Sequence, residues 1–284
     1  MAFEQGPIRP PSEAASLLLR VNRNCPWNRC AFCPVYKRRE FSKRTAEEVL
    51  ADVDEVASAV ERLREESWGR GQGGEVSPDM VAGVMRSEGQ GSAMQAAAVW
   101  LWRGQGTVFL QDADPLAVRT EDLERILAHL RSRLPGVTRV TAYARSATLA
   151  SRGAARLARL RAAGLDRVHV GIESGSDRVL ALVDKGATHD LHVRGGRAAI
   201  EAGLELSVYV MPGLGGEGLS EDHAAESARC VAAIGPHFTR LRSLAVSGRA
   251  PLAGIEAEGR LIRMGDDAVA REIRSFLEGL IRSG

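Results

Sequence analysis

Six apolar runs with strand character recur along this chain of 284 residues, and an amphipathic helical pattern follows each of them. The strand-like runs span residues 16–22, 107–110, 139–144, 167–172, 205–211 and 238–246. The helical patterns span residues 45–66, 120–134, 154–163, 176–202, 220–234 and 266–281. Repeated β/α units require a parallel sheet with helices outside it and right-handed crossovers. Because six units are too few to close an eight-stranded barrel, we predict an α/β fold, a partial (β/α)6 barrel in a single domain.

A stretch rich in Gly, Ser and Gln interrupts this pattern at residues 69–106, after a helix that opens with a capping box from Thr45 to Glu48. We interpret this stretch as an insertion that contains one helix over residues 93–102. The chain is long enough, at 44% hydrophobic residues, to bury a full core. The predicted organisation is an N-terminal extension, a barrel core that carries the insertion, and a helical tail, with bounds 1–15, 16–250 and 251–284.

Charge and composition exclude several function classes. The formal net charge is +2 and the arginines are spread along the chain, which argues against a nucleic-acid partner. No run of 18 apolar residues occurs, so no membrane span is expected, and the N-terminus lacks the basic and apolar regions of a signal peptide. Three of the four cysteines are clustered, which indicates a metal centre in a reducing cytoplasm rather than a disulfide framework.

The clustered cysteines are Cys25, Cys30 and Cys33, in the segment CPWNRCAFC directly after the first strand-like run. Three thiolates within nine residues can bind one metal centre, and they leave a four-iron cube one ligand short. The same spacing occurs in plant-type ferredoxins, which need a fourth cysteine and have another fold. A zinc site would need a second Cys or His pair, and the closest histidine is His129. We favour the cube, and we expect Cys230 to fill the core.

Polar residues or glycines follow several of the later strand-like runs, in the segments QDAD, YARS, GIES and MPGLGG. The carboxyl ends of parallel strands are where folds of this kind place their active sites. We therefore expect a functional site at this edge of the sheet, where the cysteine loop also begins.

In its cysteine motif and its strand ends, the chain resembles the radical SAM superfamily over about residues 16–250. That family carries three cysteines after the first strand of a partial barrel, usually as C-x3-C-x2-C, and this chain has one residue more between Cys25 and Cys30. The resemblance implies a [4Fe–4S] cluster on Cys25, Cys30 and Cys33, with S-adenosylmethionine (SAM) on the open iron. It also implies reductive cleavage of SAM to a 5′-deoxyadenosyl radical, a reductant such as a flavodoxin or a ferredoxin, and a substrate that the sequence does not identify.

The resemblance assigns the charged ends of SAM to two strand ends. Asp112 and Asp114 stand where the family holds the SAM ammonium, for which a carboxylate is a charge-assisted partner. Arg145, with Ser146 after it, stands where a guanidinium can fork onto the SAM carboxylate. Two plainer interpretations remain open, because aspartates before Pro115 can simply form a turn and Arg145 can be a solvated surface residue.

Three further residues are implied as SAM contacts. Phe32, before the third cysteine, matches the aromatic that packs near the adenine, although a loop aromatic also packs without a ligand. Glu173 and Ser174 belong to the segment GIESGS, where the family's polar side chains meet the ribose or the methionine carboxylate. Ser174 and Gly175 are expected to cap the following helix at the same time.

The fifth strand ends in a glycine-rich loop that begins with Met211, Pro212 and Gly213. Glycine lets the backbone approach a flat ligand closely, and the adenine contact of the family lies near this region. Four histidines in loop or helix contexts are expected at the surface rather than as ligands; they are His189, His192, His223 and His237.

Two other function classes compete with the enzyme. A non-catalytic electron-transfer or cluster-assembly protein would bind iron and sulfur without cleaving SAM, and it would have no use for Asp114, Arg145 and Glu173. A zinc-stabilised scaffold on the same barrel is the third possibility. We favour the enzyme, without an assigned catalytic residue.

Overall fold

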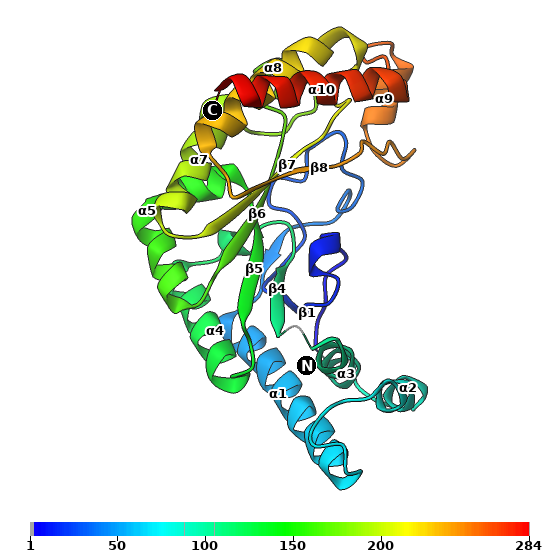
Figure 1. Cartoon of the computed structure of the whole chain (residues 1–284), viewed down its shortest axis with the longest axis vertical. Coiled ribbons are helices and arrows are strands. Elements are labelled where there is room, and N and C mark those ends of the chain that lie inside the picture. Colours follow the sequence, from blue (N-terminus) through cyan, green and yellow to red (C-terminus); the bar gives the residue numbers. More distant parts are fainter. Residues whose placement is uncertain (1–2, 88, 105, 284) are drawn as a thin grey trace. The chain divides into compact units, whose positions relative to one another are not determined.

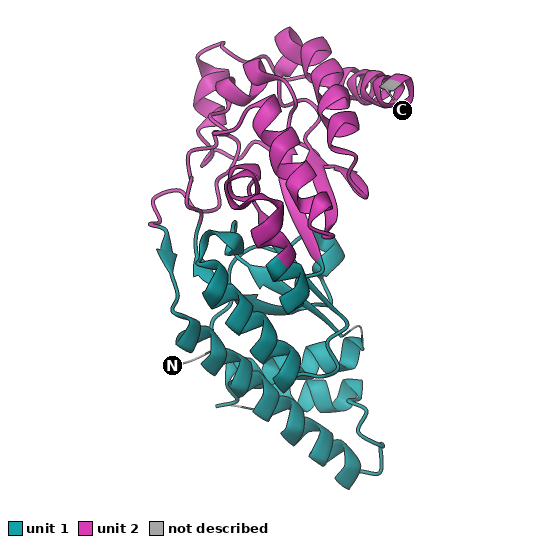
Figure 2. Cartoon of the chain, turned by 90° about the vertical axis from the view of Figure 1, so that its left-hand side faces the viewer, with its two compact units in different colours: residues 1–24, 41–143, 159–166 teal, residues 25–40, 144–158, 167–284 magenta. Residues whose placement is uncertain are grey.

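Figure 1 shows the computed structural model of the chain, which describes residues 3–87, 89–104 and 106–283. The chain divides into two compact units, which Figure 2 colours separately. Unit 1 comprises Met1–Asn24, Phe41–Tyr143 and Arg159–Asp166. Unit 2 comprises Cys25–Glu40, Ala144–Ala158 and Arg167–Gly284. The cysteine loop therefore belongs to unit 2, whereas the strand that precedes it belongs to unit 1.

Unit 1 is built on three parallel strands with β4 in the centre. They are β1 (Leu17–Arg20), β4 (Thr107–Gln111) and β5 (Arg139–Ala144). Two long helices accompany them, α1 (Ala46–Gly69) and α4 (Thr120–Arg133), and the predicted capping box opens the first of these: Thr45 accepts from the Glu48 amide and the Glu48 carboxylate accepts from the Thr45 amide. Arg20 and Gln111 are register partners, so β1 and β4 end at the same level.

The interruption in the sequence pattern contains two helices where one was predicted. The predicted helix is α3 (Ser92–Arg103), and the missed one is α2 (Pro78–Arg86). The start of α2 has the usual sequence signal of a helix N-terminus, because the Ser77 side chain accepts from the Met80 amide and Pro78 occupies the first turn. The two-residue strands β2 (Asn22–Arg23) and β3 (Ser42–Lys43) pair in antiparallel fashion and are too short for a sequence pattern.

Unit 2 is built on three further parallel strands with β7 in the centre. They are β6 (Arg167–Glu173), β7 (Glu205–Val210) and β8 (Phe238–Leu241). Its helices are α6 (Asp177–Leu182), α7 (His189–Glu201), α8 (Gly216–Ile234), α9 (Leu252–Ala257) and α10 (Asp266–Ser283). The helix α5 (Ser146–Ala163) begins earlier than predicted, and it kinks at Gly153, whose φ of 70° is not helical.

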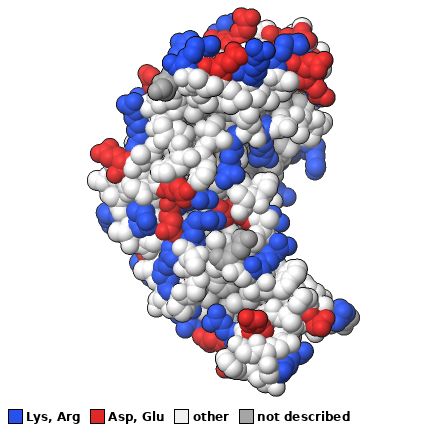
Figure 3. All heavy atoms as spheres, viewed as in Figure 1, with Lys and Arg blue, Asp and Glu red and all other residues white. Residues whose placement is uncertain are grey.

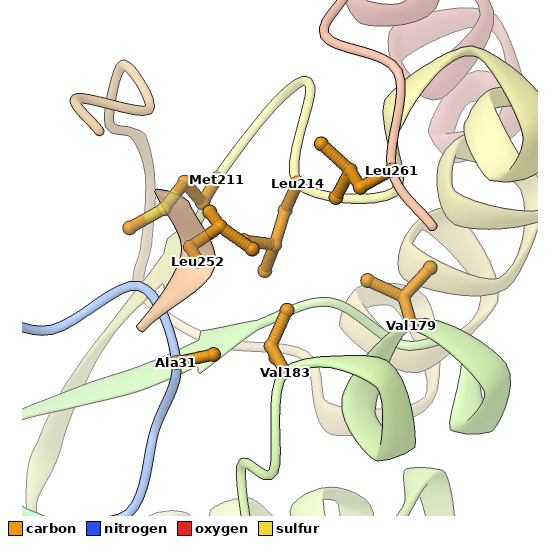
Figure 4. Packing of buried hydrophobic residues seen from close by; sticks show 7 residues of the cluster. All are labelled: Ala31, Val179, Val183, Met211, Leu214, Leu252 and Leu261. Carbon is orange, nitrogen blue, oxygen red and sulfur yellow. The ribbon is translucent and has the colours of Figure 1, made fainter. Parts of the chain in front are cut away.

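The cysteine loop packs into the apolar core of unit 2 (Figure 4). Ala31, from the middle of the loop, lies next to Val183 at the end of α6. The Ala31 amide donates to the Val183 carbonyl at 2.7 Å, and the Ala31 carbonyl accepts from the Leu252 amide at 2.9 Å. The remaining members of this core cluster are Val179, Met211, Leu214 and Leu261. The loop is thus held by backbone hydrogen bonds on both sides of one residue.

The predicted α/β fold is confirmed: within the described residues, six strands that pair in parallel alternate with helices along the chain. The domain bounds at residues 15 and 250 stay predictions. Among the helices of the described residues, none combines the length and the apolar character that crossing a membrane requires.

Candidate functional site

The cysteine loop is fixed by Trp27, which the sequence analysis did not single out. Its indole nitrogen donates to the Asp184 carbonyl at 2.7 Å, and its ring lies against Gly186 in the turn after α6. A β-carbon on Gly186 would come within 2.4 Å of the ring, and the φ of this residue is +65°, so only glycine fits. The loop therefore docks its aromatic residue on a turn built to receive it.

Asn28 stabilises the other end of the loop. Its side-chain nitrogen donates to the Tyr36 carbonyl at 2.6 Å, and its amide donates to Cys25 Sγ at 3.4 Å. Tyr36 is 1% exposed, which anchors the segment after the cysteines. Backbone N–H donors toward sulfur stabilise a thiolate, so this geometry suits a cysteine that binds metal.

The three cysteines are half-buried and close enough to affect one another electrostatically. Burial raises the pKa of the Cys30 thiol, and the Lys185 ammonium opposes this effect. Negative charge on Cys25 and on Cys33 raises the Cys30 pKa further. Within the described residues no three His, Cys, Asp or Glu side chains converge on a single metal ion. A cube does not need such convergence, because its cysteines bind different irons.

Cys230 differs from the clustered cysteines. It is fully buried on α8, and burial raises its pKa to about 12. A thiol of this kind is inert as a ligand and a nucleophile, so the expectation that it fills the core is confirmed.

The end of β6 brings Glu173 to the cysteine loop. Lys185 pairs with Glu173 at 3.3 Å and lies 5.6 Å from the centre of the Phe32 ring, while its carbonyl lies 4.0 Å from Cys30 Sγ. The second carboxylate oxygen of Glu173 is buried and has no hydrogen-bond partner among the described residues. Leaving such an oxygen unsatisfied costs about 1–3 kcal/mol, so this atom is poised to accept from a ligand.

Arg145 braces the same turn. Its guanidinium donates to the carbonyls of Lys185 and Gly186, each at 3.3 Å, and lies 5.1 Å from the centre of the Trp27 ring. The interpretation of Arg145 as a solvated surface residue is therefore wrong. Ser146, which follows it, forms a 2.6 Å hydrogen bond with Nδ1 of His192.

Two of the four histidines expected at the surface are buried, and each forms hydrogen bonds with polar groups inside the fold. His192 is 1% exposed and pairs with Ser146. His223 is also 1% exposed; its Nδ1 pairs with Ser174 at 2.8 Å and its Nε2 with the Met211 carbonyl at 3.0 Å. His223 thus ties the end of β6 to the loop after β7.

Helix α6 is capped by Ser176, which corrects the expectation for Ser174 and Gly175. The Ser176 hydroxyl accepts from the Val179 amide, while the Ser174 hydroxyl accepts from the Ser176 amide. Ser174 is therefore a bridge between the turn and His223, and the cap lies two residues later.

The glycine-rich loop after β7 is anchored by α10, from the predicted helical tail. Glu272 accepts from the Gly213 amide at 2.7 Å and from the Ser220 hydroxyl at 2.6 Å, and it lies 3.6 Å from His223 Nε2. Burial lowers the pKa of His223, and the Glu272 carboxylate partly opposes this. No periodic signal in the sequence marks a single glutamate for this role, so Glu272 was not predicted.

Asp112 and Asp114 lie in unit 1, and both are fully buried. Arg20 donates twice to one Asp112 oxygen, at 2.8 and 2.7 Å, and the Asn24 amide donates to the same atom at 2.9 Å. Asp114 precedes a short 3-10 helix without capping it by its side chain, and its carbonyl accepts from Asn22 at 2.6 Å. The turn interpretation therefore holds for the backbone of this segment.

The predicted site residues fall into two sets. Unit 1 holds the two aspartates. Unit 2 brings together the loop, the ends of β6 and β7, and the start of α5, which carry Cys25, Cys30, Cys33, Phe32, Arg145, Ser146, Glu173, Ser174, Met211, Pro212 and Gly213. Lys185 and Trp27 join them, and a lone lysine after a short helix gave no signal in the sequence.

Residues 92–228 match the family model described as the radical SAM superfamily. The matched region includes the ends of β4 to β7, while the cysteine loop lies before it. No curated protein matches the chain.

Several solved structures have a similar fold. Coproporphyrinogen III oxidase (HemN) from Escherichia coli, described as a radical SAM enzyme, superposes with a TM-score of 0.59 at 15% identity over 95% of this chain and 52% of its own. Methylornithine synthase (PylB) superposes with a TM-score of 0.55 at 15% identity, over 94% of this chain and 62% of its own. The methyltransferase TsrM from Kitasatospora setae superposes with a TM-score of 0.54 at 17% identity, over 86% of this chain and 37% of its own. The chain thus spans between about a third and two thirds of these proteins.

Proposed function

The chain contains a domain of the radical SAM superfamily, and from this premise we propose that it is an enzyme that cleaves SAM reductively and uses the resulting radical on a substrate. A [4Fe–4S] cluster held by the protein would supply the electron for the reductive cleavage of SAM to methionine and a 5′-deoxyadenosyl radical. In this proposal Cys25, Cys30 and Cys33 hold the cluster. The similar structure of TsrM is described with cobalamin and a [4Fe–4S] cluster bound.

The contact between the cysteine loop and the end of β6 carries the proposal. Lys185 approaches Cys30 with its backbone and Glu173 with its side chain, so one residue links the metal ligands to a strand-end carboxylate. The unpartnered oxygen of Glu173 fits a ligand hydroxyl or ammonium. An electron carrier or a zinc scaffold has no need for a buried acceptor at this point.

The residues of unit 2 divide the binding of SAM among them in this proposal. Phe32 and the turn from Met211 through Pro212 to Gly213 flank the adenine. Glu173 and Ser174 accept from the ribose hydroxyls, and the network of His223 holds the two strand ends at a fixed separation. The protein thereby positions the ligand and excludes water, which is its part in a reaction whose hard step belongs to the cofactor.

The charged ends of SAM are assigned to the remaining residues. Arg145 and Ser146 take the carboxylate in this proposal, although Arg145 also braces the loop, so its substitution affects both roles. For the ammonium, the expectation from the sequence stays with Asp112 and Asp114, of which Asp112 is paired with Arg20.

The electron donor is proposed to be a flavodoxin or a ferredoxin that docks beside the cysteine loop. Arg38 and Arg39 are exposed a few residues after Cys33, and positive charge at this place suits an acidic donor.

The proposal is tested by the metal content and the electron paramagnetic resonance spectrum of the protein reconstituted anaerobically with iron and sulfide. We expect about four irons and four sulfides per chain, and a reduced spectrum that changes when SAM is added. Cys30→Ala should lose the cluster, whereas Cys230→Ala, which removes the inert cysteine, should keep it. Stoichiometric zinc without sulfide, or a four-iron spectrum indifferent to SAM, would contradict the proposal.

A further inference from the structure

One face of the strands of unit 2 is polar along its whole length. The helices α7 and α8 lie on one side of β6 and β7 (Figure 1). Along both strands buried valines, a leucine and an isoleucine alternate with the other residues, and we assign these apolar residues to the helix side. Register partners in parallel strands share a face, and alternate residues lie on opposite faces. The opposite face, called the polar face below, therefore consists of Arg167, His169, Gly171 and Glu173 of β6, Glu205, Ser207 and Tyr209 of β7, and Phe238 and Arg240 of β8.

Side-chain contacts agree with this assignment. The Arg167 guanidinium pairs with Glu205 at 2.8 Å and lies 5.1 Å from the centre of the Phe238 ring. The rings of His169 and Tyr209 lie 5.7 Å apart. The polar face is thus a continuous layer of charged, aromatic and hydroxyl groups rather than an apolar barrel filling.

One of the two arginines on the polar face has no carboxylate partner, because Lys185, from outside the face, pairs with Glu173. The two glutamates are each paired with a cation, Glu205 with Arg167 and Glu173 with Lys185. Arg240, by contrast, has no carboxylate partner within the part of the chain that the structure describes. A guanidinium without a countercharge can form charge-assisted hydrogen bonds to an anion bound beside it.

Arg240 is held in a fixed orientation. Its Nε donates to the Ser207 hydroxyl at 3.0 Å, and its guanidinium carbon lies 5.5 Å from the centre of the Phe238 ring. For its two terminal nitrogens, no acceptor is found among the described residues. This leaves the fork of the guanidinium for a carboxylate or a phosphate, which both match its geometry.

Arg242 adds a second positive charge two residues later. Its amide donates to the Val210 carbonyl at 2.9 Å, which continues the pairing of β8, and its side chain is exposed. By alternation it lies on the same face as Arg240. The two arginines therefore form a cationic end of the polar face, while Glu173 marks the end next to the cysteine loop.

We propose that the polar face binds the substrate, and that this substrate is a small molecule bearing a carboxylate or a phosphate that Arg240 and Arg242 anchor. The inference rests on the proposed function and names the substrate class. Gly171, Tyr209 and Arg240 are level with one another on neighbouring strands. Strands lie about 4.8 Å apart, so the anchor is about 10 Å from β6 across the sheet, a span that a small organic molecule bridges.

The charge distribution favours a small anion over a nucleic acid. Acidic and basic side chains are interspersed over α8 and α10 on the face shown in Figure 3. A polyanion is bound by an exposed stripe of cations, whereas His169 is fully buried and Arg240 is half-buried.

The test is calorimetric titration of the full-length reconstituted protein with two probes, glutarate for a carboxylate and glucose 6-phosphate for a phosphate. We expect saturable binding of at least one probe, weakened about tenfold or more in Arg240→Met. Arg240→Lys keeps the positive charge and loses the forked geometry of the guanidinium, so its affinity for the probe should lie between those of the wild type and Arg240→Met. Arg229→Met is the matched control, because this arginine is 64% exposed on α8 and pairs with Glu226, and it should bind like the wild type.

The inference is overturned if the wild type binds neither probe saturably, or if Arg240→Met, shown by circular dichroism to be folded, binds as tightly as the wild type. Cleavage of SAM by the wild type is measured separately. Intact cleavage without Arg240-dependent binding overturns this inference alone. Arg240-dependent binding without cleavage supports the anion site and overturns the proposed function instead.

Discussion

Glu173 has a backbone φ of +65°, a conformation that residues with side chains rarely adopt. The register of β6 against β7 shifts between Gly171 and Glu173, and a β-carbon on Gly171 would lie 2.0 Å from a Glu173 oxygen. The Met211 amide donates to the Glu173 carbonyl at 2.9 Å, which holds the strained residue in place. Such strain costs about 1–3 kcal/mol and collects at functional sites. The sequence predicted Glu173 as a site residue but gave no sign of this conformation.

His192 makes the stability of the chain dependent on pH. Burial, together with the positive charge of Lys185, lowers its pKa to about 3. In the unfolded chain a histidine titrates near about 6.5, so between these values only the unfolded state binds the proton. The stability contributed by the neutral His192 is therefore present above about pH 6.5 and is lost as pH falls toward 3.

We expect the free energy of unfolding to fall between pH 7 and pH 5 by about 2 kcal/mol more in the wild type than in His192→Gln. Urea unfolding of both proteins at the two pH values measures this difference. Equal losses in the two proteins would mean that His192 is not buried in its neutral form. His237→Gln is the control, since His237 is exposed.

At the scale of elements, α10 has an exposed outer side and an inner side that holds the loop after β7. Its outer residues are exposed, as the pair of Arg274 and Glu278 shows, with 79% and 46% of the two side chains accessible. Its inner residue Glu272 accepts from the loop after β7 and from α8, so the helix fixes the loop that carries Met211 and Gly213. The sequence predicted the helix from its periodicity, whereas the role of Glu272 depends on partners about 50–60 positions away in the chain.

Glu272→Ala is expected to lower the free energy of unfolding by about 2 kcal/mol, because it leaves the Gly213 amide and the Ser220 hydroxyl without their acceptor. Hydrogen exchange of the Gly213 amide should accelerate as well, which reports on the loop itself. Glu278→Gln on the outer side of α10 should change stability by less than about 0.5 kcal/mol. An unchanged exchange rate at Gly213 in Glu272→Ala would refute the anchoring role of α10.

The elements themselves were largely predictable. Long periodic helices such as α1 and α4 were found with their starts within one or two residues, because their caps and apolar spacing are local signals. The start of α5 was missed because Gly153 breaks the helical pattern in its middle. The helix α2 was missed because the glycines around it indicate a loop, although Ser77 and Pro78 start it.

At the scale of the whole molecule, the order of strands and helices predicted the fold, and the cysteine motif and strand ends predicted a resemblance to the radical SAM superfamily, whose family model matches residues 92–228. What the sequence could not supply are contacts between distant segments. The docking of Trp27 on Gly186, the approach of the Lys185 carbonyl to Cys30 and the pairing of His223 with Ser174 each join residues that are far apart in the chain. The candidate site residues stay predictions from the sequence, and the contacts that join them could not be predicted from it.

The most direct measurement is the formation of 5′-deoxyadenosine by the anaerobically reconstituted protein with dithionite and SAM. The account predicts its release together with methionine, and its loss in Cys30→Ala but not in Cys230→Ala. Release should increase when a substrate of the right class is present, or when a flavodoxin or ferredoxin replaces dithionite. An intact four-iron cluster that leaves SAM whole under all of these conditions would contradict the account and favour a protein that carries or assembles clusters.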